Sequence, residues 1–220
     1  MKFSIEDMFK YSFCISTSNE NYETFKQRML STGFSDEMMP KMFNGNHPRT
    51  IAKNCIPIQL CTLSHFHIIN MAKTLDLPWI TIFEDDTLPM KNCREILEQF
   101  ISESELPDNA DIIIWGNLEF IHQYQWYCNN NVIYNDHYAL LRHKIWGAQS
   151  NTIFKKNYDN WLEAFRFFDD IHLGPDWYHY LAENTYVSTR SFFIQWKNNQ
   201  LQHDDLMNET DKNCLDEFII

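Results

Sequence analysis

Short apolar runs alternate with segments of helical period along most of the chain. Residues 10–16 (KYSFCIS), 78–83 (PWITIF) and 110–115 (ADIIIW) are rich in β-branched and aromatic residues, which is typical of strands covered on both faces. Between the first two runs, residues 60–75 place apolar side chains at helical spacing. Strands that alternate with helices predict a largely parallel sheet inside an α/β fold.

The same patterns predict further elements on both sides of these runs. Helices are expected over residues 22–30, 90–101, 157–168 and 175–184, the last starting at Pro175, a good first-turn residue. Shorter strands are expected over residues 38–43, 137–141, 151–154 and 192–196.

Length and composition favour one domain. The chain has 220 residues, of which 44% are hydrophobic, enough for one substantial core. It shows no internal repeat and no Gly/Ser linker, and it contains only five glycines. We therefore expect one domain over residues 1–205, followed by a loosely attached acidic tail over residues 206–220.

The net charge argues against some classes of binding partner. A formal net charge of -12 disfavours nucleic acid and a broad anionic membrane surface, so a polyanionic substrate would need a local cation. No apolar stretch approaches the roughly 20 residues needed to span a bilayer, and the N-terminus carries acids where a signal peptide is apolar. These features predict a cytoplasmic protein without a transmembrane segment, and its six scattered cysteines are expected to be free thiols.

The segment WITIFEDDTLP, residues 79–89, ends an apolar strand with Glu84, Asp85 and Asp86. In open α/β sheets, ligands bind beyond the carboxyl ends of the strands. Three adjacent carboxylates repel one another, and Mg²⁺ or Mn²⁺ would stabilise them because hard cations prefer oxygen ligands. Alternation along an extended segment points Glu84 and Asp86 to one side as the metal-binding pair. The alternative is a solvated acidic turn before the next helix.

The chain matches none of the other common catalytic and nucleotide-binding motifs. An aspartyl phosphatase needs a nucleophilic Asp where this chain has Glu84, and a Thr or Val where it has Leu88. The chain contains no P-loop, dinucleotide-binding glycine motif, zincin motif or G-x-S-x-G motif. The acidic triplet is therefore the main chemical signal.

Residues 61–92, CTLSHFHIINMAKTLDLPWITIFEDDTLPMKN, resemble the core of the lipooligosaccharide-type glycosyltransferase family 25. The family pattern is a Gly-Cys-x-x-Ser-His helix start, an apolar strand and Glu-Asp-Asp. The segments DIIIWG, WGAQSNTIFKKNYDNWL and GPDWY extend the similarity over residues 10–196. Leu60 replaces the usual Gly before Cys61, and the Arg pair common after the first strand is missing.

The resemblance implies a GT-A-like fold, with one Rossmann-like domain that transfers a hexose, usually galactose, from a UDP-sugar to a glycan acceptor such as lipooligosaccharide. It implies that Glu84 and Asp86 hold Mn²⁺ or Mg²⁺ against the diphosphate and that Asp85 positions the donor. Ser64 and His65 would shape the donor pocket. His203 is a candidate third metal ligand, or a solvated surface histidine.

An inverting reaction also needs a base for the acceptor hydroxyl. Asp176 in the GPDWY segment is the candidate, with helix capping as its alternative role and Asp169 and Asp170 as substitutes. Its neighbours Trp177 and Tyr178 are candidates for stacking on an acceptor sugar. An inactive carbohydrate- or nucleotide-sugar-binding protein of the same fold is the alternative function.

A basic and aromatic stretch, residues 142–168, offers a weak peripheral contact with the inner face of a membrane. Lys155 and Lys156 would contact lipid phosphate. One face of the following helix is formed by Tyr158, Trp161, Leu162 and Phe165. That face is expected to dock on the sheet, and lying on a membrane is the alternative.

Overall fold

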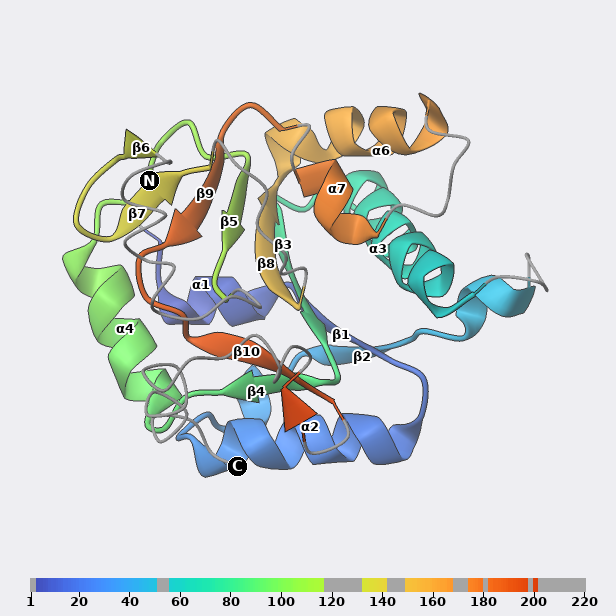
Figure 1. The fold of residues 1–220 in the computed structure, drawn as a ribbon, viewed down its shortest axis with the longest axis horizontal. Coiled ribbons are helices and arrows are strands. Elements are labelled where there is room, and N and C mark those ends of the chain that lie inside the picture. The colour runs from blue at the N-terminus through green and yellow to red at the C-terminus, as the bar shows by residue number, and fades with distance from the viewer. Residues whose placement is uncertain are drawn as a thin grey trace.

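The chain folds around an eight-stranded sheet in the order β2-β1-β3-β8-β5-β9-β7-β6 (Figure 1). A computed structural model describes residues 3–50, 56–116, 132–141, 149–167, 174–179, 182–197 and 200–201. The strands of this sheet are β1 (Ser12–Ser16), β2 (Lys41–Asn44), β3 (Trp79–Glu84), β5 (Ile112–Ile114), β6 (Val132–Ile133), β7 (Tyr138–Leu140), β8 (Ser150–Phe154) and β9 (Thr185–Ser188).

The sheet is mostly parallel, which confirms the prediction of an α/β fold. β1 pairs in parallel with β2 and β3, and β5 pairs in parallel with β9. β8 runs antiparallel between β3 and β5, and β7 runs antiparallel to both β9 and β6. Six strands therefore point one way, and the carboxyl ends of β1, β3 and β5 meet at one edge.

Helices cover both faces of the sheet (Figure 1). Side chains alternate along β3, so that Phe83 joins the hydrophobic cluster on one face while Ile80 and Ile82 join the cluster on the other. On the Phe83 face lie α1 (Ile5–Lys10), α2 (Asn19–Ser31) and α4 (Cys93–Glu103). On the opposite face lie α3 (Pro57–Thr74), α6 (Tyr158–Phe167) and α7 (Pro175–His179).

A second, three-stranded sheet lies beside the carboxyl edge of the main sheet (Figure 1). It consists of β4 (Thr87–Pro89), β10 (Phe193–Lys197) and β11 (Gln200–Leu201), with β10 antiparallel to both neighbours. Gly116 passes so close to β10 that an added Cβ atom would lie 1.9 Å from the carbonyl oxygen of Phe193. A residue without a side chain is therefore required at this position.

The predicted elements are present, with differences at their ends and in the short pieces. The predicted helix from Pro175 was too long, because α7 ends at His179 and residues 182–184 form a turn that leads into β9. The pattern also missed β9 and several short elements: α1, β4, β6, β11 and the 3-10 turns η1 (Asp36–Met38), η2 (His47–Thr50) and η3 (Lys155–Asn157). Free thiols are found, as predicted, at Cys14, Cys61 and Cys93. Cys55, Cys128, Cys214 and the predicted tail lie outside the described residues.

The apolar face of α6 docks on the core, as expected. Tyr158, Trp161 and Leu162 are all buried. The two lysines before them have acidic partners: Lys155 Nζ lies 2.6 Å from Asp76, and Lys156 Nζ lies 3.4 Å from Asp111. Among the described residues, no helix combines the length and apolarity needed to cross a membrane.

Candidate functional site

The acidic triplet lies at the carboxyl edge of the main sheet. Glu84 ends β3, Asp85 and Asp86 form a turn, and β4 starts at Thr87. The Glu84 N–H donates to the Gln149 carbonyl at 3.0 Å. The Asp85 N–H donates to the carbonyl of Ile15 in β1, also at 3.0 Å. β1 on one side of β3 and the residue before β8 on the other therefore fix the backbone that carries the three carboxylates.

The carboxylates of the triplet contact three different elements. The Cys61 thiol of α3 donates to Glu84 Oε1 at 3.2 Å. The hydroxyl of Ser16, at the end of β1, donates to Asp85 Oδ2 at 2.6 Å. The Gln195 amide of β10 donates to Asp86 Oδ2 at 2.7 Å. All three acids are half-buried, so that protein donors as well as water stabilise their charge.

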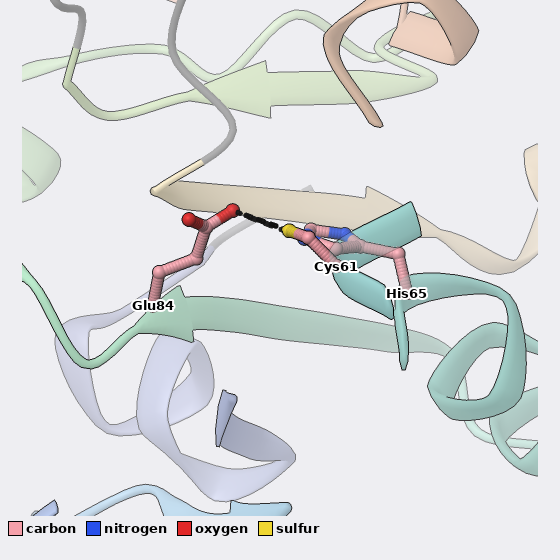
Figure 2. A group of neighbouring side chains, drawn as sticks. All are labelled: Cys61, His65 and Glu84. Atoms are coloured by element: carbon pink, nitrogen blue, oxygen red, sulfur yellow. Dashed lines mark hydrogen bonds and ion pairs between the residues drawn. The ribbon is translucent and has the colours of Figure 1, made fainter. Parts of the chain in front are cut away.

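The start of α3 supplies the neighbours of Glu84 (Figure 2). Cys61 and His65 are one turn apart, which places them on the same face of the helix. His65 is fully buried, and its Nε2 atom lies 3.5 Å from Glu84 Oε1. Ser64 is also fully buried, and its hydroxyl donates to the Leu60 carbonyl at 2.7 Å within the same helix. The structure thus brings His65 to the triplet and occupies the Ser64 hydroxyl with its own backbone.

Several acids affect the pKa of the Cys61 thiol. Burial raises its pKa well above the usual value, and the negative charge of Glu84 and the hydrogen bond to that carboxylate raise it further. Asp176 and Asp86 add to the increase in pKa. Carboxylates from two segments far apart in the sequence, the acidic turn and the start of α7, therefore act on the same thiol.

Asp176 is the second residue of α7, a short helix that lies beside α3 and α6 (Figure 1). Its carboxylate is half-buried. Asp176 Oδ2 lies 3.6 Å from the position that a Cβ atom would take on Gly174. The side chain therefore folds back over the start of the helix, on the side of α3.

The structure corrects the expected role of Tyr178. Its side chain is 1% exposed, and its ring lies 4.8 Å from the ring of Trp161 and 5.7 Å from that of Phe165, centroid to centroid. The ring packs between α7 and α6 and offers no face for an acceptor sugar, because the position of Tyr178 in α7 directs its side chain toward the core. The side chain of Trp177 and the residues His203, Asp169 and Asp170 lie outside the described part.

Sequence reasoning missed two residues at this site. Cys61 was expected as a free thiol and as part of the family's Gly-Cys-x-x-Ser-His pattern but not as a site residue, although its spacing of four from His65 on a predicted helix was a usable signal. Arg28 of α2 was not singled out. Burial lowers the pKa of its guanidinium, and the charges of Asp86 and Asp85 act in the opposite direction. Arg28 is therefore a cation that interacts electrostatically with the acidic turn.

One family model matches most of this chain. The family model described as glycosyltransferase family 25 (LPS biosynthesis protein) matches residues 15–174. No curated protein sequence matches the chain. Among solved structures, the apo form of mouse xyloside xylosyltransferase 1 is similar with a TM-score of 0.38 and 12% sequence identity, over 78% of this chain and 80% of that one.

Proposed function

The chain belongs to glycosyltransferase family 25, and from this we propose that it transfers a hexose, most simply galactose, from a UDP-sugar to a glycan acceptor such as lipooligosaccharide or a surface polysaccharide. The acidic turn is the observation that carries the proposal. It lies at the carboxyl edge of a mostly parallel sheet, where α/β folds bind their ligands, as a GT-A-like enzyme requires.

The donor set at the turn fits a hard divalent cation. Glu84, Asp85 and Asp86 present oxygen ligands only, and Mn²⁺ and Mg²⁺ prefer oxygen. In the proposal, Glu84 and Asp86 hold the ion, with His203 as a further ligand. When bound, the metal would neutralise the negative charge that develops on the diphosphate as UDP departs.

The residues around the turn would hold the donor in place. Ser16 fixes the carboxylate of Asp85, which in the proposal orients the donor sugar or ribose. Gln195 fixes Asp86 from the second sheet. His65 and Ser64 are buried beneath this edge, where they shape the pocket by packing and by holding Glu84 and the start of α3. Such fixed neighbours matter because small displacements of a reacting group reduce the rate.

Asp176 is the proposed general base. Its carboxylate would accept the proton of the acceptor hydroxyl while that oxygen forms a bond to the anomeric carbon of the donor and the bond to the UDP oxygen breaks. Attack from the side opposite the leaving group inverts the anomeric centre. The charge that Asp176 exerts on Cys61, which also contacts Glu84, supports its placement near the donor edge. Trp177, which follows Asp176 in α7, is the proposed platform for the acceptor sugar.

A binding protein that has lost catalysis is the second candidate. It would keep the fold and the pocket but would not turn over a donor. The presence of all three acids of the turn, together with Asp176, favours an enzyme.

A donor screen separates these two functions. The purified protein is incubated with a panel of UDP-sugars, with and without Mn²⁺, and release of UDP is measured. We expect one UDP-hexose to yield UDP in the presence of Mn²⁺ only. If a UDP-sugar binds but no UDP is released under any condition, even with acceptor glycans present, the protein is a binding protein and not an enzyme.

A further inference from the structure

Cys61, His65 and Glu84 bring three different metal-binding atoms together (Figure 2). Two of them come from one face of α3, and the third comes from the end of β3. The thiol sulfur, an imidazole nitrogen and a carboxylate oxygen all lie within 4.8 Å of one another. Glu84 Oε1 is the common neighbour, 3.2 Å from Cys61 Sγ and 3.5 Å from His65 Nε2.

These spacings are close to the edges of a zinc coordination tetrahedron. Zn²⁺ binds sulfur at about 2.3 Å and nitrogen or oxygen at about 2.0–2.1 Å, so that tetrahedral ligand atoms lie about 3.3–3.6 Å from one another. The sulfur–oxygen edge of such a tetrahedron is about 3.6 Å and the nitrogen–oxygen edge about 3.3 Å, so the observed 3.2 Å and 3.5 Å differ from these edges by about 0.4 Å and 0.2 Å. Small rotations of the Cys61 and His65 side chains, which belong to the same helix, would bring the three atoms to these separations.

The ligand types select zinc over the metal proposed for catalysis. Thiolate and imidazole suit Zn²⁺, whereas Mn²⁺ and Mg²⁺ prefer an all-oxygen set. Three protein ligands leave a fourth position for water, as in zinc sites that are not purely structural. Binding removes the thiol proton, which is released to solvent, because a coordinating thiol is deprotonated.

We propose that Cys61, His65 and Glu84 form a Zn²⁺ site, and that bound zinc inhibits the enzyme by taking Glu84 away from the acidic turn. The zinc site stands on the geometry of the three residues alone. The inhibition rests on the proposed function, because it requires that Glu84 also holds the metal that binds the donor.

Cobalt titration tests the site without any measurement of activity. Co²⁺ replaces Zn²⁺ in such sites, and a thiolate ligand gives it a near-ultraviolet charge-transfer band. We expect the metal-free protein to bind one equivalent of Co²⁺ with this band, and one equivalent of Zn²⁺ to remove it. Cys61→Ser should abolish the band, and His65→Gln should weaken Zn²⁺ binding at least about tenfold in competition with a chromophoric chelator.

Matched variants control for general effects of the substitutions. Cys93→Ser removes another buried thiol, and His67→Gln removes another imidazole from α3. Both should keep the cobalt band of the wild type. Thermal unfolding of every variant checks that it is folded. A wild-type protein without the thiolate band, or a band that survives in folded Cys61→Ser, would overturn the site.

The inhibition has its own readout. UDP release in Mn²⁺ is measured with and without added Zn²⁺, and the ratio is compared within each variant. Zinc should reduce the wild-type rate at least about tenfold and should reduce the Cys61→Ser rate much less. Equal inhibition of both proteins would overturn the competition for Glu84. If no UDP is released at all, the proposed function fails, while the cobalt spectrum still decides the zinc site.

Discussion

Each of the three acids of the turn contacts a different element of the fold. Glu84 contacts the start of α3, Asp85 contacts Ser16 of β1, and Asp86 contacts Gln195 of β10. Adjacent carboxylates repel one another by several kcal/mol at an effective dielectric constant of about 20. These three donors and the positive charge of Arg28 offset part of that repulsion. Three carboxylates that are held in this way are suited to bind a divalent cation.

Asp176→Asn tests the proposed base at the same scale. An amide has nearly the same shape as the carboxylate but accepts no proton, so we expect kcat to fall about a hundredfold or more with near-normal UDP binding. Steady-state kinetics and UDP titration measure the two quantities. Glu183→Gln, an exposed position, is the matched control and should leave both unchanged. A joint loss of UDP affinity and turnover in Asp176→Asn would instead assign the residue to donor binding.

The position of the site could be predicted from single residues, whereas its contacts could not. Glu84 to Asp86 were recognisable because charges at the end of a buried strand need stabilisation. The contact between Cys61 and Glu84 was not predicted, because it depends on how α3 crosses the sheet. Tyr178 was assigned to the acceptor because it is adjacent to Asp176, but the register of α7 turns its ring into the core.

The strands and helices that hold the site were mostly recognisable from their patterns. The long apolar runs predicted β1, β3 and β5, and helical spacing predicted α2, α3 and α6. The antiparallel direction of β8 was not predictable, because hydrophobic pattern does not encode strand direction. β9 was missed because its four residues directly follow the segment that was predicted as a helix, and β4 has only three residues.

Gly116→Ala tests whether the second sheet positions the acidic turn. The added Cβ atom would lie 1.9 Å from the Phe193 carbonyl oxygen, so β10 has to move. Gln195 lies on the same strand and would lose its contact with Asp86. We expect lower thermal stability and a reduction of UDP release similar to that of Gln195→Ala.

A second glycine provides the control for Gly116→Ala. At Gly33 a Cβ atom has room, its nearest neighbour being Arg94 Cβ at 3.5 Å, but the φ of 99° strains any other residue. Gly33→Ala should therefore reduce stability while retaining the rate of UDP release. Wild-type rates in a stable Gly116→Ala protein would show that the close approach to β10 is not needed for function.

Across the whole molecule, two hydrophobic clusters hold the helices to opposite faces of the sheet. Tyr138 of β7 is fully buried in the cluster that includes α1, α2 and α4. Its hydroxyl lies 3.1 Å from that of Ser104, after the end of α4. Burial raises the pKa of this phenol to about 12, because the charged form is poorly solvated inside the core.

This shift in pKa makes the fold sensitive to alkaline pH. In the unfolded chain the phenol loses its proton near pH 10, and in the folded protein only near pH 12. Between these values the unfolded state binds fewer protons, so the free energy of unfolding falls as pH rises, by roughly 1.4 kcal/mol per pH unit.

Urea unfolding at pH 8 and pH 11 measures this sensitivity. Wild type should lose about 1 to 2 kcal/mol more than Tyr138→Phe between the two pH values. Tyr134→Phe, at a half-exposed ring, controls for loss of a hydroxyl and should behave like wild type. Equal pH dependence of Tyr138→Phe and wild type would show that the phenol is not held in its neutral form by the core.

The most direct test of the account is metal-dependent release of UDP at the acidic turn. Wild type, Asp86→Asn and the control Glu98→Gln, which alters an exposed acid of α4, are assayed with the preferred UDP-sugar in Mn²⁺ and in EDTA. We expect wild type and Glu98→Gln to release UDP in Mn²⁺ only, and folded Asp86→Asn to be slower by at least about a hundredfold because the cation loses a charged ligand. Full activity in EDTA, or a wild-type rate in Asp86→Asn, would contradict the assignment of Asp86 and of the turn as the metal and donor site.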